Sequence, residues 1–189
     1  QLIEALTSIK ANPLTDGICR EGLAQAAGHL LSAFENGADL KAREGMSLAS
    51  LCGGLALANA GLGAVHGFAG PLGGMINAPH GMICAALLPA VMAANAAALE
   101  VQAPGAPALA RFREVAVLLT GRADARIDDG IEWIRDLVAR LQLPGLAVLG
   151  LKKGDLDAAV AKAGCASSMK GNPVALTTGA LKGILEAAL

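Results

Sequence analysis

Residues 40–62 read LKAREGMSLASLCGGLALANAGL, residues 81–99 read GMICAALLPAVMAANAAAL, and these two stretches decide the fold class. The first carries apolar residues at the spacing of one helical face, which predicts a long helix. The residues expected on that apolar stripe are Leu48, Leu51, Leu55 and Ala58. The second is apolar almost throughout, and its length is close to the roughly 20 residues of a bilayer-spanning helix.

The second stretch fits a buried helix better than a membrane span. It contains Pro89 and Asn95, lies between His80 and Glu100, and has no aromatic or basic anchors at its ends. We therefore predict a central helix that is buried on all sides, and no membrane association.

The composition of the chain supports an all-α fold. Of the 189 residues 54% are hydrophobic, yet only three Phe, one Trp and no Tyr are present. The apolar residues are mainly Ala, Leu, Val and Met, whereas aromatic and β-branched residues dominate strands. The 24 glycines indicate close helix contacts and tight connections, because Gly destabilises a helix unless its packing requires one.

Helix-breaking residues divide the chain into the expected elements. Asn12-Pro13 ends a first short helix, and Thr15 or Asp16 is the expected N-cap of the next. Residues 63–79 contain five Gly and two Pro, so we expect a loop-rich crossing there. The expected helices cover about residues 2–9, 15–34, 40–62, 81–99, 108–120, 128–142, 155–163 and 178–189, and no strand is expected.

Charge and cysteine usage exclude several classes of protein. The net charge is −1 and no run of Lys or Arg exceeds two, which leaves no electrostatic footprint for nucleic acid or an anionic membrane. The four cysteines show neither CxxC nor zinc-finger spacing. We interpret Cys19, Cys52, Cys84 and Cys165 as small buried hydrophobic residues in a reducing, cytoplasmic compartment.

Three histidines are the candidates for site chemistry. His29 lies in a helical stretch without a visible partner, and we interpret it as a partly exposed structural residue. His66 and His80 lie in Gly- and Pro-rich surroundings at the edges of apolar helices, where two partly desolvated imidazoles suit a divalent metal. A separation of fourteen residues is no general metal motif, so spacing alone leaves two structural histidines as an equal alternative.

The sequence around this pair resembles the signature of the iron-containing (group III) alcohol dehydrogenases. The matching segments are GGLALANAGLGAVH at residues 53–66, GPLG at 70–73, PHG at 79–81 and LLP at 87–89, together with Asn95. NPLTD at residues 12–16 and Asn172-Pro173 match further family segments, so the resemblance covers essentially the whole chain.

The resemblance implies that residues 1–189 form an all-α, C-terminal metal-binding domain of the dehydroquinate synthase-like type. In this family an α/β dinucleotide-binding domain precedes the helical one, and the active site lies between them. The implied reaction interconverts an alcohol and an aldehyde or ketone with NAD or NADP, in a homo-oligomer. The chain alone has no recognisable nucleotide fold and is expected to lack dehydrogenase activity.

The family's metal takes an Asp, a His four residues later, and two further His. His66 and His80 match the last two ligands, while Gln1 falls where the first His would be and offers a poorer amide ligand. The resemblance implies Fe2+, with Zn2+ as the alternative. Family members often carry another His where this chain has Gly70, and we expect Phe68 and Gly70 to shape the substrate pocket.

Two alternatives stay open at this point. One is a related glycerol dehydrogenase or dehydroquinate synthase-like enzyme, against which the PLGG and PHG context at residues 71–74 and 79–81 argues. The other is a non-catalytic helical module that oligomerises through its apolar face and whose two histidines are structural.

Overall fold

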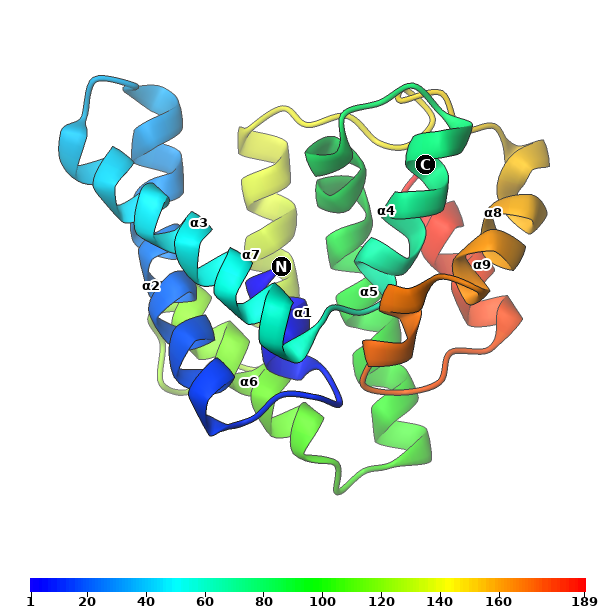
Figure 1. Ribbon diagram of the computed structural model, residues 1–189, viewed down its shortest axis with the longest axis horizontal. Coiled ribbons are helices and arrows are strands. Elements are labelled where there is room, and N and C mark those ends of the chain that lie inside the picture. The colour runs from blue at the N-terminus through cyan, green and yellow to red at the C-terminus, as the bar shows by residue number, and fades with distance from the viewer.

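The computed structural model describes all 189 residues, and it is all-α, as predicted. Seven α-helices precede a long connection, and two shorter α-helices with two 3-10 turns complete the chain (Figure 1). Their bounds are α1 Leu2–Thr7, α2 Pro13–Glu35, α3 Leu40–Ala60, α4 Ala64–Met75, α5 His80–Gln102, α6 Pro107–Thr120, α7 Ile127–Arg140, η1 Lys153–Asp155, α8 Leu156–Gly164, η2 Ser167–Gly171 and α9 Thr178–Ala187.

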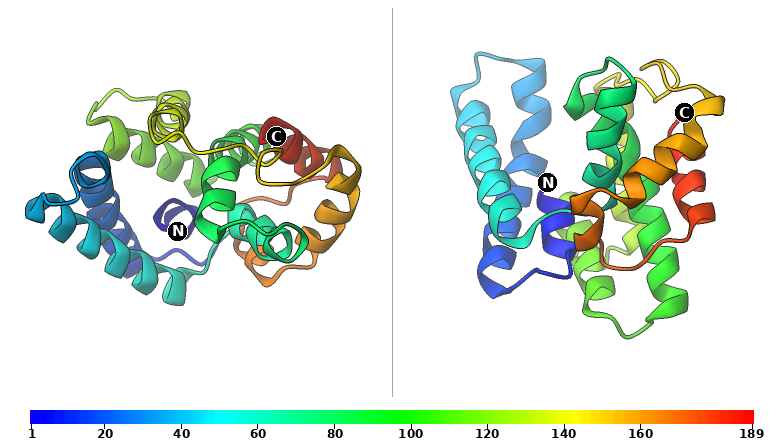
Figure 2. Two further views of the ribbon diagram at one scale, coloured as in Figure 1. Left: turned by 90° about the horizontal axis from the view of Figure 1, so that it is seen from above. Right: turned by 45° about the vertical axis from the view of Figure 1, so that its right-hand side comes forward.

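Helix α5 joins the two hydrophobic cores of the domain. Its first half packs Leu87 and Val91 into a core shared with α4, α8 and α9. Its second half packs Met92 and Leu99 into a core shared with α1, α2, α6 and α7. Figure 2 shows the result: α2 and α3 lie at one end of the molecule, α8 and α9 at the other, and α5 runs between them.

The prediction of a long central helix at 81–99 is confirmed, but its burial is less complete than expected. By length and composition alone α5 could cross a membrane, and 44% of its most apolar window is buried. It packs against α4, α6, α7 and α9, while Glu100 and Val101 at its end are exposed. Helix α5 is therefore the core helix of this domain, open to solvent along part of its length.

The expected loop-rich crossing at 63–79 is wrong, because most of it is helix α4. Val65, Phe68 and Leu72 repeat every three to four residues and are at most 2% exposed, so one helical face enters the core. Pro71 lies inside the helix and lacks an N–H. Gly67 allows close packing, since a Cβ there would lie 2.9 Å from Met169 Cε in η2. Burial of this face outweighs the poor helix propensity of Gly and Pro.

The predicted apolar stripe on 40–62 is also wrong. Leu48, Leu51, Leu55 and Ala58 are exposed on α3. The side that packs on α2 consists of small residues, namely Ala42, Gly45, Ala49, Cys52, Ala56 and Ala60. A Cβ on Gly45 would lie 2.1 Å from the ring of His29, so the two helices approach too closely for leucine side chains between them. His29 is thus a half-buried packing residue.

Helix α2 begins one turn earlier than expected. Asn12 is its N-cap and accepts hydrogen bonds from the N–H groups of Leu14 and Thr15, while the Thr15 hydroxyl accepts from the Asn12 N–H. Asp16 is not a cap; it pairs with Arg111 of α6 at 2.9 Å. At the other end of the chain Thr177 caps α9, and its hydroxyl accepts from the Ala180 N–H.

Replacing Asn12 with alanine is expected to lower the free energy of unfolding by about 1 kcal/mol, because two N–H groups of α2 lose their acceptor. Urea denaturation followed by circular dichroism measures this difference. Replacing Asn36, the C-cap residue at the other end of α2, is the control and should have a smaller effect. Equal losses for the two variants would contradict the assigned cap.

Candidate metal centre

His66 and His80 lie together at the surface where α4 and α5 begin. The centroids of their rings are 5.4 Å apart, with the ring planes tilted by 52°. The side chain of His66 is 11% exposed, and His80 is exposed as the first residue of α5. The two imidazoles that the sequence singled out are therefore close enough to share one ion.

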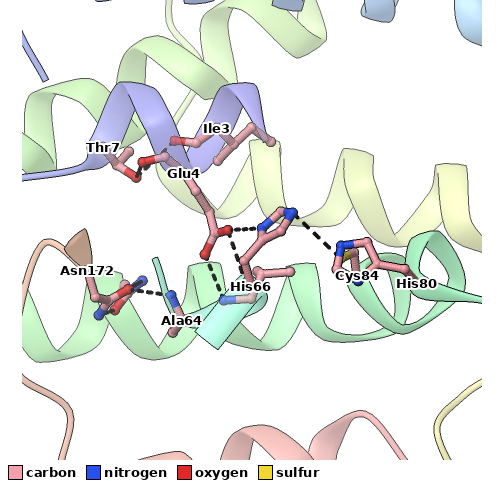
Figure 3. A network of polar contacts seen from close by, with 10 residues as sticks. Ile3, Glu4, Thr7, Ala64, His66, His80, Cys84 and Asn172 are labelled. Carbon is pink, nitrogen blue, oxygen red and sulfur yellow. Dashed lines mark hydrogen bonds and ion pairs between the residues drawn. The ribbon is translucent and has the colours of Figure 1, made fainter. Parts of the chain in front are cut away.

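A third candidate ligand, a thiol, joins the two imidazoles from the second turn of α5. Cys84 lies one helical turn after His80, and its Sγ is 3.5 Å from His80 Nε2 and 3.9 Å from His66 Nε2. The three ligand atoms lie within 4.8 Å of one another (Figure 3). The interpretation of Cys84 as a mere buried hydrophobic residue missed this cluster, although the His-x-x-x-Cys spacing places both side chains on one helical face.

The other cysteines divide by burial. Cys19 and Cys52 are buried, as predicted, but Cys165 is exposed, so the prediction is wrong for that residue. Burial raises the pKa of the Cys19 thiol and of the Cys84 thiol to about 11. Without a bound cation both are therefore neutral thiols near neutral pH.

Glu4 on α1 fixes the orientation of His66. Its carboxylate is 6% exposed, and Oε2 lies 2.5 Å from His66 Nδ1 (Figure 3). A carboxylate only accepts hydrogen bonds, so Nδ1 carries the proton and Nε2 keeps its lone pair on the side of His80 and Cys84. Sequence reasoning missed Glu4; its only signal was a lone acidic residue in the apolar stretch LIEALT.

The same carboxylate caps helix α4, whose N-cap Gly63 has no side chain. Glu4 Oε1 accepts from the Val65 N–H at 2.7 Å, and Asn172 Oδ1 accepts from the Ala64 N–H at 3.1 Å. A Cβ on Gly63 would lie 2.9 Å from each of these two oxygens, so glycine is required there. A negative charge at a helix N-terminus is also favourable. His66 is thus held through both its ring and its backbone.

Asn172 is fixed in turn by a reciprocal amide pair with Asn95 of α5. Asn95 Nδ2 donates to Asn172 Oδ1 at 3.0 Å, and Asn172 Nδ2 donates to Asn95 Oδ1 at 2.7 Å and to the Val174 carbonyl at 2.8 Å. Both amides are buried, and every polar atom of the pair has a partner. The C-terminal segment therefore helps to place the first turn of α4.

The remaining predicted site residues do not join the cluster directly. Gln1 is exposed before α1, and its Oε1 lies 2.8 Å from where a Cβ on Gly53 would be. Phe68 is fully buried in the core around α4, where its side chain contacts only core neighbours. This position does not fit the expected role of Phe68 in the wall of a substrate pocket. Gly70 is exposed one turn after His66, with open space beside it.

The donor set fits a borderline divalent cation. Two imidazole nitrogens and one sulfur converge, and the one imidazole with a fixed hydrogen-bond partner directs its other nitrogen toward the cluster. A hard cation such as Mg2+ prefers oxygen ligands, which the cluster does not offer.

Comparison with known proteins decides the family. The sequence profile described as "Fe-containing alcohol dehydrogenase family, C-terminal" matches residues 2–189. The chain belongs to the iron-containing alcohol dehydrogenase family. Within that family it is 34% identical over 188 residues to alcohol dehydrogenase 4 of Schizosaccharomyces pombe, covering 99% of this chain and 43% of the relative. It is 36% identical to the 1,3-propanediol dehydrogenase of Citrobacter freundii, covering 81% of this chain and 42% of that protein.

Solved structures of the family share the fold. The crystal structure of a 1,3-propanediol oxidoreductase superposes with a TM-score of 0.90 at 30% identity, covering 100% of this chain and 48% of that one. An alcohol dehydrogenase from Oenococcus oeni gives a TM-score of 0.89 at the same identity. The chain thus spans less than half the length of its iron-containing alcohol dehydrogenase relatives, and it corresponds to their helical part.

Proposed function

We propose that this chain supplies the metal-binding wall of an alcohol dehydrogenase active site. The observation that carries the proposal is the convergence of His66 and His80, with His66 Nε2 directed at the cluster by Glu4. In the whole enzyme an N-terminal dinucleotide-binding domain would face this wall and hold NAD or NADP. The reaction would interconvert a small alcohol and the corresponding aldehyde or ketone.

A divalent ion at this site would act as a Lewis acid that polarises the substrate oxygen. The chain's own residues then have separate tasks. His66 and His80 each offer a neutral imidazole nitrogen, and Glu4 holds the tautomer of His66 in which this nitrogen is free. Fe2+ is the ion that the family name implies, and Zn2+ is the alternative that imidazole ligands also suit. Gln1 would complete the set only as a weak amide ligand.

The open side of α4 is the proposed place of substrate and nicotinamide. Gly70 lies four residues after His66 and therefore on the same helical face, and nothing lies within 4 Å of the position of its missing Cβ. A larger side chain in this position would fill the space next to His66. Glycine instead leaves room for a ligand beside the two imidazoles, while Phe68 supports the same helix from the core.

Assembly and location are part of the same proposal. Leu48, Leu51 and Leu55 expose 39%, 60% and 44% of their surface on α3, which supports burial of this face in a homo-oligomer. The four cysteines are unpaired, which supports a reducing compartment such as the cytoplasm.

The test is metal binding by the purified protein and by variants of the two histidines. His66→Ala and His80→Ala are each expected to weaken binding of Zn2+ or Fe2+ by more than about 100-fold, since loss of a ligand should exceed the 10–100-fold effect of losing an outer partner. Metal content after gel filtration, measured by mass spectrometry, reports the loss. His29→Ala is the matched control, because His29 packs on Gly45 away from the cluster, and it should bind metal like the wild type.

A protein that binds neither ion, with lowered stability in both variants, would instead favour the non-catalytic module with structural histidines. Wild-type metal content in His66→Ala and His80→Ala would place the metal elsewhere in the chain.

A further inference from the structure

We propose that Cys84 is a third protein ligand of the metal, so that this site is a His-His-Cys site with a preference for zinc over iron. The inference rests on the proposed function, because it concerns the same ion. It adds a residue that the four-ligand set of Asp and His does not contain. The observation behind it is that Cys84 Sγ lies within 3.9 Å of an Nε2 atom of each imidazole (Figure 3).

The geometry is close to that of a tetrahedral ion. With metal–nitrogen and metal–sulfur bonds of about 2.0 and 2.3 Å, nitrogen and sulfur ligands of one tetrahedral ion lie about 3.5 Å apart. Cys84 Sγ lies 3.5 Å from His80 Nε2 and 3.9 Å from His66 Nε2. The two sulfur–nitrogen distances therefore agree with a tetrahedral ion to within a few tenths of an ångström, and all three ligand atoms lie within 4.8 Å of one another.

The fold holds this arrangement before any ion binds. His80 and Cys84 are separated by one turn of α5, so their side chains point to the same face of a continuous helix. His66 is held from the other side by Glu4, whose Oε2 accepts from both the ring Nδ1 and the backbone N–H of His66. Only His80 is exposed and free to adjust, while His66 and Cys84 are half-buried.

The ligand type has a consequence for metal selection. A thiolate is a soft ligand that favours Zn2+ and Cu+, whereas carboxylates and water suit harder ions. Three protein ligands with one position left open is the arrangement of catalytic zinc sites, which keep the fourth position for water or substrate. Gln1, which stands in the position of the family's first His ligand, offers only a weak amide oxygen. Cys84 would replace that imidazole as a strong ligand, and its thiolate would add a negative charge to the site.

A packing role for Cys84 is the alternative. Its side chain also contacts the core around α4, where a small hydrophobic residue would fit equally well. Packing would be kept by alanine, and it would be indifferent to the presence of metal. The two roles therefore differ in what a metal does to the sulfur.

Cobalt binding separates the two roles spectroscopically. Purified protein titrated with Co2+ is expected to develop a near-ultraviolet thiolate-to-cobalt charge-transfer band. Cys84→Ser and Cys84→Ala should lose this band and bind Co2+ and Zn2+ at least about 10-fold more weakly. Cys52→Ser and Cys165→Ser are the matched controls, one buried and one exposed, and both should keep the band.

Alkylation of the wild-type protein provides a measurement that does not depend on variants folding. Zn2+ is expected to protect Cys84 from iodoacetamide, as read by peptide mass spectrometry, while exposed Cys165 is labelled equally with and without the ion. If Co2+ or Zn2+ binds through His66 and His80 but leaves Cys84 labelling and the near-ultraviolet spectrum unchanged, the inference is overturned and the proposed metal site stands. If neither ion binds to the wild type, the proposed function fails together with the inference.

Discussion

Replacing Glu4 with glutamine is expected to weaken metal binding at the His66/His80 site by about 10- to 100-fold, the range for loss of an outer-sphere partner. The carboxylate accepts from His66 Nδ1 with one oxygen and from the Val65 N–H with the other. An amide has only one accepting atom. If the amide oxygen keeps the hydrogen bond from the Val65 N–H, the amide NH2 group faces His66 Nδ1. The imidazole must then move its proton to Nε2, and Nε2 loses the lone pair that would bind the metal. If the amide flips, two N–H donors face each other at Val65.

The same substitution should lower the stability of the metal-free protein by about 1 kcal/mol, because two charge-assisted hydrogen bonds are lost and the neutral amide either forces His66 into its other tautomer or leaves the buried Val65 N–H without an acceptor. Isothermal titration with Zn2+ gives the first quantity, and urea denaturation without metal gives the second. Glu44→Gln, an exposed glutamate on α3, is the control for charge and should change neither. Unchanged affinity in Glu4→Gln, with the protein folded, would mean that Glu4 serves only as a helix cap.

Long segments with one dominant pattern were the predictable part of this fold. The helix at 40–62 and the apolar helix at 81–99 were located within three residues at each end, because their length leaves few alternatives. The face that each helix buries was less predictable. On α3 the leucines lie outside and the small residues inside, because the close approach of α2 excludes large side chains. A pattern of hydrophobic residues does not reveal how closely two helices approach each other.

Helix α4 escaped prediction because its stability comes from distant segments. Glycine and proline argue against a helix there, and Gly63 offers no side-chain cap. Glu4 and Asn172 supply the caps from opposite ends of the chain, 61 and 108 residues from the N–H groups that they accept. No local pattern carries that information, although the spacing of Val65, Phe68 and Leu72 is that of one helical face.

The residues of the candidate site also differ in how far the local sequence identifies them. The resemblance identified His66 and His80, whose Gly and Pro surroundings are distinctive along the sequence. Glu4 has no distinctive neighbours, and Cys84 is marked only by its spacing of four residues from His80, so the importance of both arises from the positions of their oxygen and sulfur atoms relative to the imidazoles. Contacts between separate helices thus determine which ordinary residues acquire chemical roles.

Gly171→Ala is expected to cause the largest loss of stability, at least about 3 kcal/mol, in the upper range for overpacking. A Cβ at this position would lie 2.1 Å from the backbone carbonyl oxygen of Leu62, so it meets main chain rather than a side chain that could move aside. The Gly171 carbonyl also accepts from the Ile9 N–H at 3.1 Å. Relief of the clash must therefore move η2 away from the segment that enters α4.

That displacement should reach the metal site, because the next residue is Asn172, which caps Ala64. We expect Gly171→Ala to weaken Zn2+ binding as well as to lower the midpoint of thermal unfolding. Gly54→Ala is the matched control: Gly54 lies in the middle of α3 with nothing within 4 Å of its missing Cβ, and the change should stabilise the protein by about 0.5–1 kcal/mol. A folded Gly171→Ala variant with wild-type stability and reduced Zn2+ affinity would show that η2 positions His66 without contributing to the fold. Loss of stability with wild-type Zn2+ affinity would show that the Asn172 cap is dispensable for the imidazole pair, and would leave Glu4 as the residue that holds His66.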